Sequence, residues 1–405
     1  SIKKIERNLH RRKPKKGNLN LMDVLVIGAG PAGLMAAEVL ASRGREVTIV
    51  DSKPSFGRKF LMAGKSGLNI TKEESFDCFM QSFREDKIKL EPILKVFGPE
   101  QIKKWVQDLG QEIFVGSTGR IFPKSMKASP LLRAWLQRIK EYGVRFETNH
   151  KWIDWDDSFV FDTPSGKRLF KPKTVILALG GSSWSKLGSD GKWDKIFKAR
   201  KINLNQFKPT NVGIRVDWSK FMHKYAGEPL KNIKISSGDL VIKGEAMVTE
   251  SGLEGGGIYE LSASLRDGGN LVIDMFPNSN LNHIISLLSK ARKKNSIGNH
   301  LRKTLKLKGV RLALVNEFLR PIPSDIKELA RSLKHLEINY LGTQPIDQAI
   351  STSGGVPFEV LDENLMLKEE PQVFCVGEMI DWDAPTGGYL LTACISTGYW
   401  VGLNA

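Results

Sequence analysis

The stretch DVLVIGAGPAGLMAAEVLASRGREVTIVD, residues 23–51, decides the fold of this chain. Val24 to Ile27 is a continuous apolar run, which is typical of a strand buried on both faces of a parallel sheet. A glycine turn, a helical segment and a second apolar run, Val47 to Val50, come next. This order of strand, turn, helix and strand predicts a Rossmann-like α/β unit.

The glycines of the turn have the spacing G-x-G-x-x-G. Gly28 permits a tight turn, Gly30 lets a pyrophosphate approach the backbone, and Gly33 lets the helix lie close to the strand. The helix begins near Pro31, and its free N–H groups and dipole favour phosphates. Asp51 is placed to accept hydrogen bonds from a ribose. A glycine turn that binds nothing is the alternative. Because all the parts are in order, we predict a dinucleotide site that includes Gly28, Gly30, Pro31, Ala32, Gly33 and Asp51.

A loop dense in Gly, Lys and Arg follows, SKPSFGRKFLMAGKSGLNIT (52–71). This loop begins directly after Asp51, the predicted ribose-binding residue, so its backbone is expected to run beside the cofactor. Its cations suit a pyrophosphate and its glycines allow close approach. The expected contacts are Ser52, Lys53, Arg58, Lys59, Gly64, Lys65, Gly67 and Asn69. A basic surface loop is the alternative. The 2′-phosphate of NADP would also suit these cations, but Asp51 would repel it.

Further glycine turns follow apolar runs later in the chain. Thr174 to Leu179 is predicted to be a buried strand, Ile350 to Val356 a glycine turn, and Gln372 to Val376 another buried strand. Ligands of open α/β sheets sit at the C-terminal ends of such strands. We therefore add to the predicted cofactor site Gly180, Gly181, Gly377, Glu378, Pro385, Thr386, Gly387, Gly388 and Tyr389.

The length of 405 residues suggests two domains. Residues 73–110 and 131–142 have helical patterns, and residues 144–161 alternate as in a short β-meander. Residues 205–275 alternate and are rich in Gly and Asp, which predicts a small β-barrel or curved sheet, and residues 281–335 are helical and basic. The predicted fold class is α/β. A Rossmann-like domain with a parallel sheet (22–191 and 342–405) is interrupted by an inserted β-barrel and helical domain (192–341).

Composition narrows the chemistry. Hydrophobic residues make up 41% of the chain, as in soluble globular proteins, and the most apolar stretch, Val24 to Ala41, contains three glycines, a proline and Glu38. No membrane contact is expected. Cys78, Cys375 and Cys394 are widely separated, which argues for a reducing compartment and against a dithiol relay. The six histidines show no ligand spacing, so no metal is predicted.

The net charge of +17 is concentrated at the N-terminus. Residues 1–16 hold eight Lys or Arg against one Glu, a net charge of +7. We expect residues 1–21 to be a basic, disordered tail, because they lack apolar periodicity and aromatic residues. Weak contact with RNA or anionic lipid, or a targeting role, are the alternatives. The expected location is cytoplasmic, or an organellar matrix if residues 1–21 belong to a targeting sequence.

Six stretches between residues 24 and 400 carry a resemblance to a known family: VLVIGAGPAGLMAA, GRKFLMAGKSGLNIT, GRIFPKSMKAS, VILALGGSSW, ISTSGGV and VGEMIDWDAPTGGYLLTACISTGY. They resemble FAD-binding flavoproteins with two dinucleotide-binding folds. More closely they resemble bacterial NAD(P)/FAD-dependent oxidoreductases of the "aminoacetone oxidase family FAD-binding enzyme" type, in the branch ending in DWDAPTGGYLL. The larger branch has GGGRCN at residues 64–69, so any role of that arginine and cysteine does not carry over.

The resemblance implies non-covalent FAD and hydride or electron transfer on an unidentified small molecule. The flavin ring is expected near 64–69, 353–356 and 385–389. Glu378 would hold a sugar-alcohol hydroxyl, and the amides at the start of the last helix would face the pyrimidine oxygen. Ring neighbours without assigned roles are Lys65, Asn69, Arg120 and Tyr389. No second G-x-G-x-x-G marks a separate NAD(P)H domain, so two reductants stay open: NAD(P)H bound transiently at the flavin face, or the substrate itself.

Two other interpretations stay open. One is a flavin-dependent RNA-modifying reductase, which the basic helices of 281–335 would suit. The other is a non-catalytic nucleotide-binding protein that has kept the fold.

Overall fold

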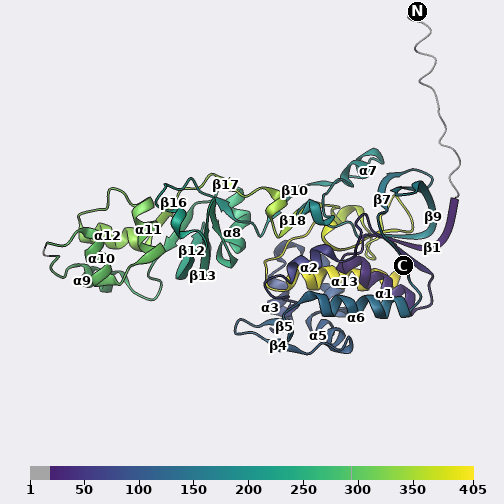
Figure 1. Cartoon of the computed structure of the whole chain (residues 1–405), viewed down its shortest axis with the longest axis horizontal. Helices are drawn as coiled ribbons and strands as arrows, with labels where there is room; N and C mark the ends of the chain where they lie inside the picture. Colours follow the sequence, from purple (N-terminus) through teal and green to yellow (C-terminus); the bar gives the residue numbers. More distant parts are fainter. Residues whose placement is uncertain (1–18, 293) are drawn as a thin grey trace, which may run out of the picture.

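The computed structural model describes residues 19–292 and 294–405, which form two units lying end to end (Figure 1). Each unit has its own hydrophobic core. The first core is built from residues between Val24 and Ile202 together with residues from Val356 to Val401. The second core spans Ile214 to Ile338. The chain thus leaves the first unit, builds the second, and returns.

The first unit is organised around a sheet with the order β6-β2-β1-β9-β8-β7, in which β19 also pairs with β9. β1, β2, β6, β9 and β19 run parallel, and Val24 of β1 lies between Val47 of β2 and Thr174 of β9. β7, β8 and β9 form the antiparallel meander. The strands are β1 (Leu19–Ile27), β2 (Val47–Val50), β6 (Arg145–Glu147), β7 (Lys151–Trp155), β8 (Phe159–Thr163), β9 (Gly166–Leu177) and β19 (Val373–Cys375).

Helix α1 is the central helix of this unit because it is covered on nearly every side. It begins at Pro31, and every residue from Ala32 to Ala41 is buried. It packs against the sheet and against α13 and α6. The other elements of this unit are α2 (Arg58–Ala63), β3 (Thr71–Lys72), α3 (Phe76–Gln81), the 3-10 helix η2 (Arg84–Asp86), α4 (Lys87–Val96), α5 (Pro99–Asp108), β4 (Ile113–Val115), β5 (Arg120–Pro123), α6 (Ala128–Glu141), α7 (Asp194–Ala199) and α13 (Tyr389–Asn404).

The second unit is a sheet with the order β16-β15-β12-β13-β14-β11-β17. Helix α8 (Gly256–Arg266) packs against β12, β13, β14 and β17, and its Ile258, Leu261 and Leu265 enter the second core. The strands are β11 (Ile214–Arg215), β12 (Pro229–Ser237), β13 (Leu240–Thr249), β14 (Gly252–Glu254), β15 (Leu271–Asp274), β16 (Leu336–Ile338) and β17 (Gly342–Thr343); the helices are α9 (Leu281–Leu288), α10 (Ile297–Leu305), α11 (Gly309–Phe318) and α12 (Ile326–Lys334).

The structure places several segments differently from the sequence prediction. The second unit is an open sheet and not a closed barrel: its described strands run from β16 to β17 without those two pairing, and α8 covers one face. Residues 351–355 form strand β18 (Ser351–Gly355), antiparallel to β10 (Asn205–Thr210), where we expected a glycine turn. A β-carbon on Gly354 would lie 2.3 Å from the oxygen of Gln206, so glycine is needed here for close strand contact.

The limits of the units also differ. We expected the insert to begin near residue 192, but Trp193 and Phe197 pack into the first core and the second core begins at Ile214. Residues 19–21, expected to be part of the tail, belong to β1. The remainder of the predicted tail, residues 1–18, lies outside the described residues. Among the described helices there is none long and apolar enough to cross a membrane.

Candidate functional site

A cavity of about 400 Å³ lies at the C-terminal edge of the parallel sheet, where β1, β2, β9 and β19 end. Ligands of open α/β sheets bind at this edge. Of the residues predicted to bind a cofactor, those lining the cavity are Gly28, Gly30, Pro31, Ala32, Asp51, Ser52, Lys53, Arg58, Lys59, Gly180, Gly377 and Glu378.

The three fingerprint glycines have different surroundings. A β-carbon on Gly28, whose φ is +104°, would lie 2.2 Å from the oxygen of Ala178, and one on Gly33 would lie 2.0 Å from the oxygen of Gly28. Nothing lies within 4 Å of a β-carbon on Gly30, which faces the cavity. Gly28 and Gly33 therefore serve the turn and the helix packing, whereas Gly30 leaves space for a ligand.

Asp51 is held rigidly at the end of β2. Its Oδ2 accepts a hydrogen bond of 2.9 Å from the amide of Ala29, and its Oδ1 accepts one of 2.9 Å from the amide of Lys53. Burial raises the pKa of Asp51, while these two amides act to lower it. Each carboxylate oxygen keeps a further lone pair, so both remain able to accept a hydroxyl hydrogen bond.

One polar atom at the cavity fits an anionic ligand. Arg58 Nε is buried without a hydrogen-bond partner among the described residues, and Arg58 lines the cavity. Asn69 Oδ1 is also buried and unpaired among the described residues, but Asn69 does not line the cavity. Arg58 Nη1 donates to Ser55 Oγ at 3.2 Å, so Nε is the nitrogen that a dinucleotide pyrophosphate beside the glycine turn would satisfy.

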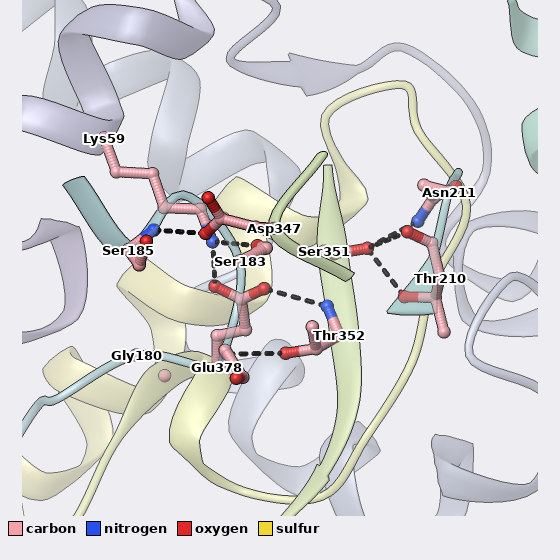
Figure 2. A network of polar contacts seen from close by, with 12 residues as sticks. Lys59, Gly180, Ser183, Ser185, Thr210, Asn211, Asp347, Ser351, Thr352 and Glu378 are labelled. Atoms are coloured by element: carbon pink, nitrogen blue, oxygen red, sulfur yellow. Dashed lines mark hydrogen bonds and ion pairs between the residues drawn. The ribbon is translucent and has the colours of Figure 1, made fainter. Parts of the chain in front are cut away.

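Glu378 connects three segments at the floor of the cavity (Figure 2). Its Oε2 lies 2.7 Å from Lys59 Nζ, and its Oε1 accepts a hydrogen bond of 3.1 Å from the amide of Thr352. Lys59 also donates to Ser183 Oγ at 3.0 Å. A β-carbon on Gly181 would lie 2.0 Å from Thr352 Oγ1 and 3.2 Å from the Glu378 carboxyl carbon, so glycine lets the chain pass this close to both. The Glu378 carboxylate thus ties α2 to β18, and Lys59 extends the connection to the turn after β9.

Replacing Glu378 by alanine is expected to weaken FAD binding roughly ten- to a hundred-fold. The change leaves the Lys59 ammonium without its carboxylate and the Thr352 amide without its acceptor, so the cavity floor loosens. Fluorescence titration of the apoprotein with FAD measures the effect. Glu370→Ala is the matched control, because Glu370 pairs with Arg200 on the same unit and lines neither cavity described in this section. Equal FAD affinity in the two variants would contradict the role of Glu378.

The cysteines offer no reactive thiol at this site. Cys394 lines the cavity, but burial raises its pKa to about 12, and Cys375 is fully buried with its pKa raised for the same reason. A thiol that stays protonated is a poor nucleophile. Cys78 is exposed on α3. The described residues contain no group of three or more His, Cys, Asp or Glu that could hold a metal ion.

A second cavity, the interunit groove, has a volume of about 890 Å³ and lies between the two units. The first unit contributes Lys72, Ser82, Thr118, Arg120, Pro385, Thr386, Gly387 and Tyr389; the second contributes Lys231, Asn232, Ile233, Ile242, Lys243, Gly244, Glu245, Gly256, Gly257, Glu260, Pro277 and Asn278. Four of these side chains are cationic and two are carboxylates, so the groove suits an anionic or polar ligand.

The start of α13 forms one wall of this groove. Gly387 and Gly388 precede Tyr389 with φ values of +125° and +97°, and a β-carbon on Gly388 would lie 2.5 Å from the Cα of Thr71. A β-carbon on Gly387 would lie 3.9 Å from Arg120 Nε. The structure therefore brings the predicted residues Arg120, Tyr389 and Pro385 to Gly387 together. Gly64 and Gly67 pack against Ala128 and Met126, Lys65 is exposed, and neither Lys65 nor Asn69 lines the groove or the first cavity.

The sequence interpretation missed Lys72, Glu74 and the groove residues of β12 and β13. Lys72 Nζ donates to Tyr389 Oη at 2.8 Å, and Tyr389 Oη donates to Glu74 Oε1 at 2.6 Å. These partners are more than 310 residues apart in the chain, so no local pattern joins them. A usable signal was the position of Lys72 and Glu74 directly after the predicted cofactor loop 52–71.

A cluster of carboxylates lies at the junction of the units. The amide of Asp383 donates to Asp86 Oδ2 at 3.2 Å. Burial, and next the neighbouring carboxylates of Asp381 and Asp383, raise the pKa of Asp86 to about 6. Burial also raises the pKa of Asp383, although Arg84 and Arg266 act to lower it. Asp86 therefore takes up a proton in the folded protein at a pH where the unfolded chain has already lost it.

Asp86→Asn is expected to stabilise the protein at pH 8 by about 1–2 kcal/mol, after allowance for solvent screening. The folded-state pKa is raised to about 6, so the contribution of Asp86 to stability is present at low pH and is lost as the pH rises through about 6. Asparagine keeps an acceptor for the Asp383 amide. Urea unfolding at pH 5 and pH 8, with the same FAD loading, measures this. Asp157→Asn, in the exposed turn after β7, is the control. A gain that is equal at both pH values would contradict the assignment.

Comparison with known proteins agrees with this geometry. The family model described as "HI0933-like protein Rossmann domain" matches residues 22–404. The chain is 23% identical over 402 residues to a ribosomal RNA dihydrouridine synthase of Haemophilus influenzae, covering 94% of this chain and 97% of that protein. It is 24% identical to a protein of the same description from Escherichia coli, covering 91% and 94%.

A solved structure supports the fold. The 3-ketosteroid delta1-dehydrogenase of Sterolibacterium denitrificans, in complex with 1,4-androstadiene-3,17-dione, aligns with a TM-score of 0.54 at 11% identity, covering 95% of this chain and 99% of that one. At this identity the likeness shows the fold alone, the α/β Rossmann-like fold of FAD-binding oxidoreductases. The family match over nearly the whole described chain identifies it: this protein belongs to the HI0933-like Rossmann-domain family.

Proposed function

We propose that this protein is an FAD-dependent oxidoreductase that holds FAD non-covalently and acts on a substrate bound in the interunit groove. The observation that carries the proposal is the cavity at the ends of β1, β2, β9 and β19, in which Gly30 leaves open space beside the rigidly held Asp51. When bound, FAD supplies hydride or electron transfer. The protein supplies orientation, charge and the exclusion of water.

The residues of the first cavity fit the adenosine diphosphate half of FAD. Gly28, Gly30 and the N-terminus of α1 would hold the pyrophosphate, Arg58 would neutralise it, and Asp51 would hold the ribose. The N-terminus of α13, which follows two glycines, would stabilise negative charge on the flavin ring. On these assignments FAD would extend from the first cavity toward the start of α13, which lines the interunit groove.

The cofactor is tested by heat denaturation of the purified protein. We expect a yellow protein that releases FAD and not FMN, because FMN has no adenylate for the Gly28 to Asp51 site. Anaerobic titration with NADH and NADPH, followed by flavin absorbance, then identifies a transient nicotinamide donor. A colourless protein that cannot be reconstituted with FAD would overturn the proposal.

A second candidate function is the reduction of a uracil base in ribosomal RNA. Both full-length relatives reported above are described as ribosomal RNA dihydrouridine synthases. The groove is cationic, and the second unit carries further exposed cations on and around α10, namely Lys290, Arg292, Lys294, Arg302 and Lys303. Phosphate contacts of this kind supply RNA affinity that falls with salt. A small-molecule substrate remains the first candidate, because the groove alone does not require a polymer.

The two substrates are separated by incubating the FAD-loaded, reduced protein with ribosomal RNA from cells that lack its gene. Mass spectrometry of the digested RNA measures dihydrouridine. Formation of dihydrouridine at one position promotes the RNA candidate. If no dihydrouridine forms and small unsaturated molecules reoxidise the flavin, the small-molecule candidate is supported. RNA contact by the basic tail stays a prediction, as does membership of the branch ending in DWDAPTGGYLL.

A further inference from the structure

Three side chains from two distant segments meet at the wall of the interunit groove. Lys72 ends β3, Glu74 follows it by two residues, and Tyr389 begins α13. Lys72 Nζ lies 2.8 Å from Tyr389 Oη and 3.1 Å from Glu74 Oε2, and Tyr389 Oη lies 2.6 Å from Glu74 Oε1. Lys72 and Tyr389 both line the groove. The three polar ends therefore form a closed triangle of hydrogen bonds beside the space for a substrate.

Packing fixes the position of the phenol. The Tyr389 residue is only 4% exposed, and its ring centroid lies 4.8 Å from that of Phe79 and 6.2 Å from that of Phe83. Gly387 lies against the edge of the same ring, where a β-carbon would come within 3.3 Å. A ring held on both sides in this way presents its hydroxyl at one place, which is a requirement for a proton donor.

We propose that Tyr389 is the proton donor of the reaction in the groove, with Lys72 and Glu74 as positioning residues. The inference rests on the proposed function, and it adds a catalytic residue for substrates that take up both a hydride and a proton, with an activated carbon–carbon double bond as the case tested below. Reduction of such a bond adds a hydride to one carbon and a proton to its neighbour. The electron pair is that of the proposed flavin reaction. The proton comes from Tyr389 Oη, whose O–H bond and hydrogen bond to Glu74 Oε1 both break as the proton moves to the substrate carbon.

The same triangle of hydrogen bonds stabilises the negative charge that is left on Tyr389 Oη after proton transfer. After the proton leaves, the Lys72 ammonium 2.8 Å away stabilises the phenolate. A proton from Lys72 Nζ then restores the phenol, and Lys72 is refilled from solvent, since its side chain is 26% exposed. In the resting protein, burial and the Glu74 carboxylate raise the pKa of Tyr389, so the phenol keeps its proton at neutral pH.

A purely structural role would tie β3 to α13 without any part in chemistry. A structural role and a proton-donor role predict different effects of a Tyr389 variant on two electron acceptors, ferricyanide and an alkene. Ferricyanide takes electrons without a proton, whereas reduction of an alkene requires one. A structural defect would slow both reactions, but loss of a proton donor slows only the second.

The experiment reduces FAD-loaded protein anaerobically and mixes it with ferricyanide or with a panel of alkenes: 2-cyclohexen-1-one, uridine and ribosomal RNA. Tyr389→Phe is expected to keep its ferricyanide rate within about twofold and to lose alkene reduction by about 10²- to 10⁴-fold. Tyr399→Phe is the matched control, since Tyr399 lies on the same helix, stacked on Phe97 at 4.1 Å, and does not line the groove. It should keep both rates.

A second measurement needs no substrate. Subtracting the ultraviolet pH titration of Tyr389→Phe from that of the parent isolates the Tyr389 phenolate. Lys72→Met is expected to move its midpoint upward by about one pH unit or more, because the neighbouring cation is lost. Unchanged alkene reduction in Tyr389→Phe, an equal loss with both acceptors, or a parent that reduces ferricyanide but no alkene would overturn the inference. Failure of the parent to bind FAD would instead overturn the proposed function.

Discussion

Gly30→Val is expected to give a folded protein whose affinity for FAD is at least about 100-fold lower, on the order of 3 kcal/mol. The reason is the surroundings of Gly30. No atom lies within 4 Å of an added β-carbon, so the branched side chain meets no protein group. It does project into the cavity where the pyrophosphate must touch the backbone. The substitution is therefore expected to weaken FAD binding and to leave the stability of the fold unchanged.

Gly33→Val gives the opposite result and serves as the comparison. A β-carbon there would lie 2.0 Å from the oxygen of Gly28, so α1 cannot keep its distance from the turn. We expect Gly33→Val to lower the stability of the apoprotein itself, independently of FAD binding. FAD content after gel filtration and thermal unfolding of the apoproteins measure the two effects separately. Stoichiometric FAD in Gly30→Val would mean that the pyrophosphate binds elsewhere.

The sequence predicted the fold of the first unit well because the determinants are local. Strand, glycine turn, helix and terminal acid follow one another over residues 23–51, and each has a geometric requirement that few residue types meet. The structure has β1, α1 and β2 in those places, with Asp51 bonded to the turn it follows. The same reasoning located the strands that end at residues 177 and 375.

The misread segments depend on distant partners. Residues 351–355 contain two glycines and look like a turn, but pairing with β10 draws them into a strand. Trp193 and Phe197 follow a change in local character, yet Phe197 packs against Trp152 and Trp155 of the first unit, and Trp193 packs against Phe197. Tertiary packing determines the structure of both segments, and the local sequence pattern contains no information about that packing.

The candidate site also has a part that the local sequence predicts and a part that depends on distant partners. Part of the first cavity could be predicted, because Gly28, Asp51, Gly180 and Gly377 directly follow the ends of strands or lie in the turns after them. His150, Trp152 and Trp193 also line it, and the sequence interpretation missed them. The interunit groove could not, since it exists only where β12, β13 and α8 of one unit face Lys72, Arg120 and the start of α13 of the other. The pairing of Lys72 with Tyr389 depends on how the last helix enters the first unit.

Gly398→Ala is expected to destabilise the protein by about 2–4 kcal/mol and to weaken FAD binding as well. Gly398 lies in α13 at its closest approach to α1, where a β-carbon would be 2.1 Å from the oxygen of Ala32. That atom belongs to the backbone of the first turn of α1, so it cannot move without the helix. Ala32 also lines the cofactor cavity. One methyl group thus pushes the phosphate-binding turn and the last helix apart.

The matched control is Gly298→Ala, the same substitution in α10. No atom lies within 4 Å of a β-carbon there, so alanine is expected to stabilise the protein by about 0.5–1 kcal/mol through the lower entropy of its unfolded chain. Urea unfolding of the apoproteins compares the two, and FAD titration then shows whether the loss in Gly398→Ala extends to the cofactor. If Gly398→Ala is as stable as its control, α1 and α13 tolerate separation, and their contact does not fix the phosphate site. If stability falls but FAD affinity does not, the turn at Gly28 to Gly33 holds its shape independently of α13.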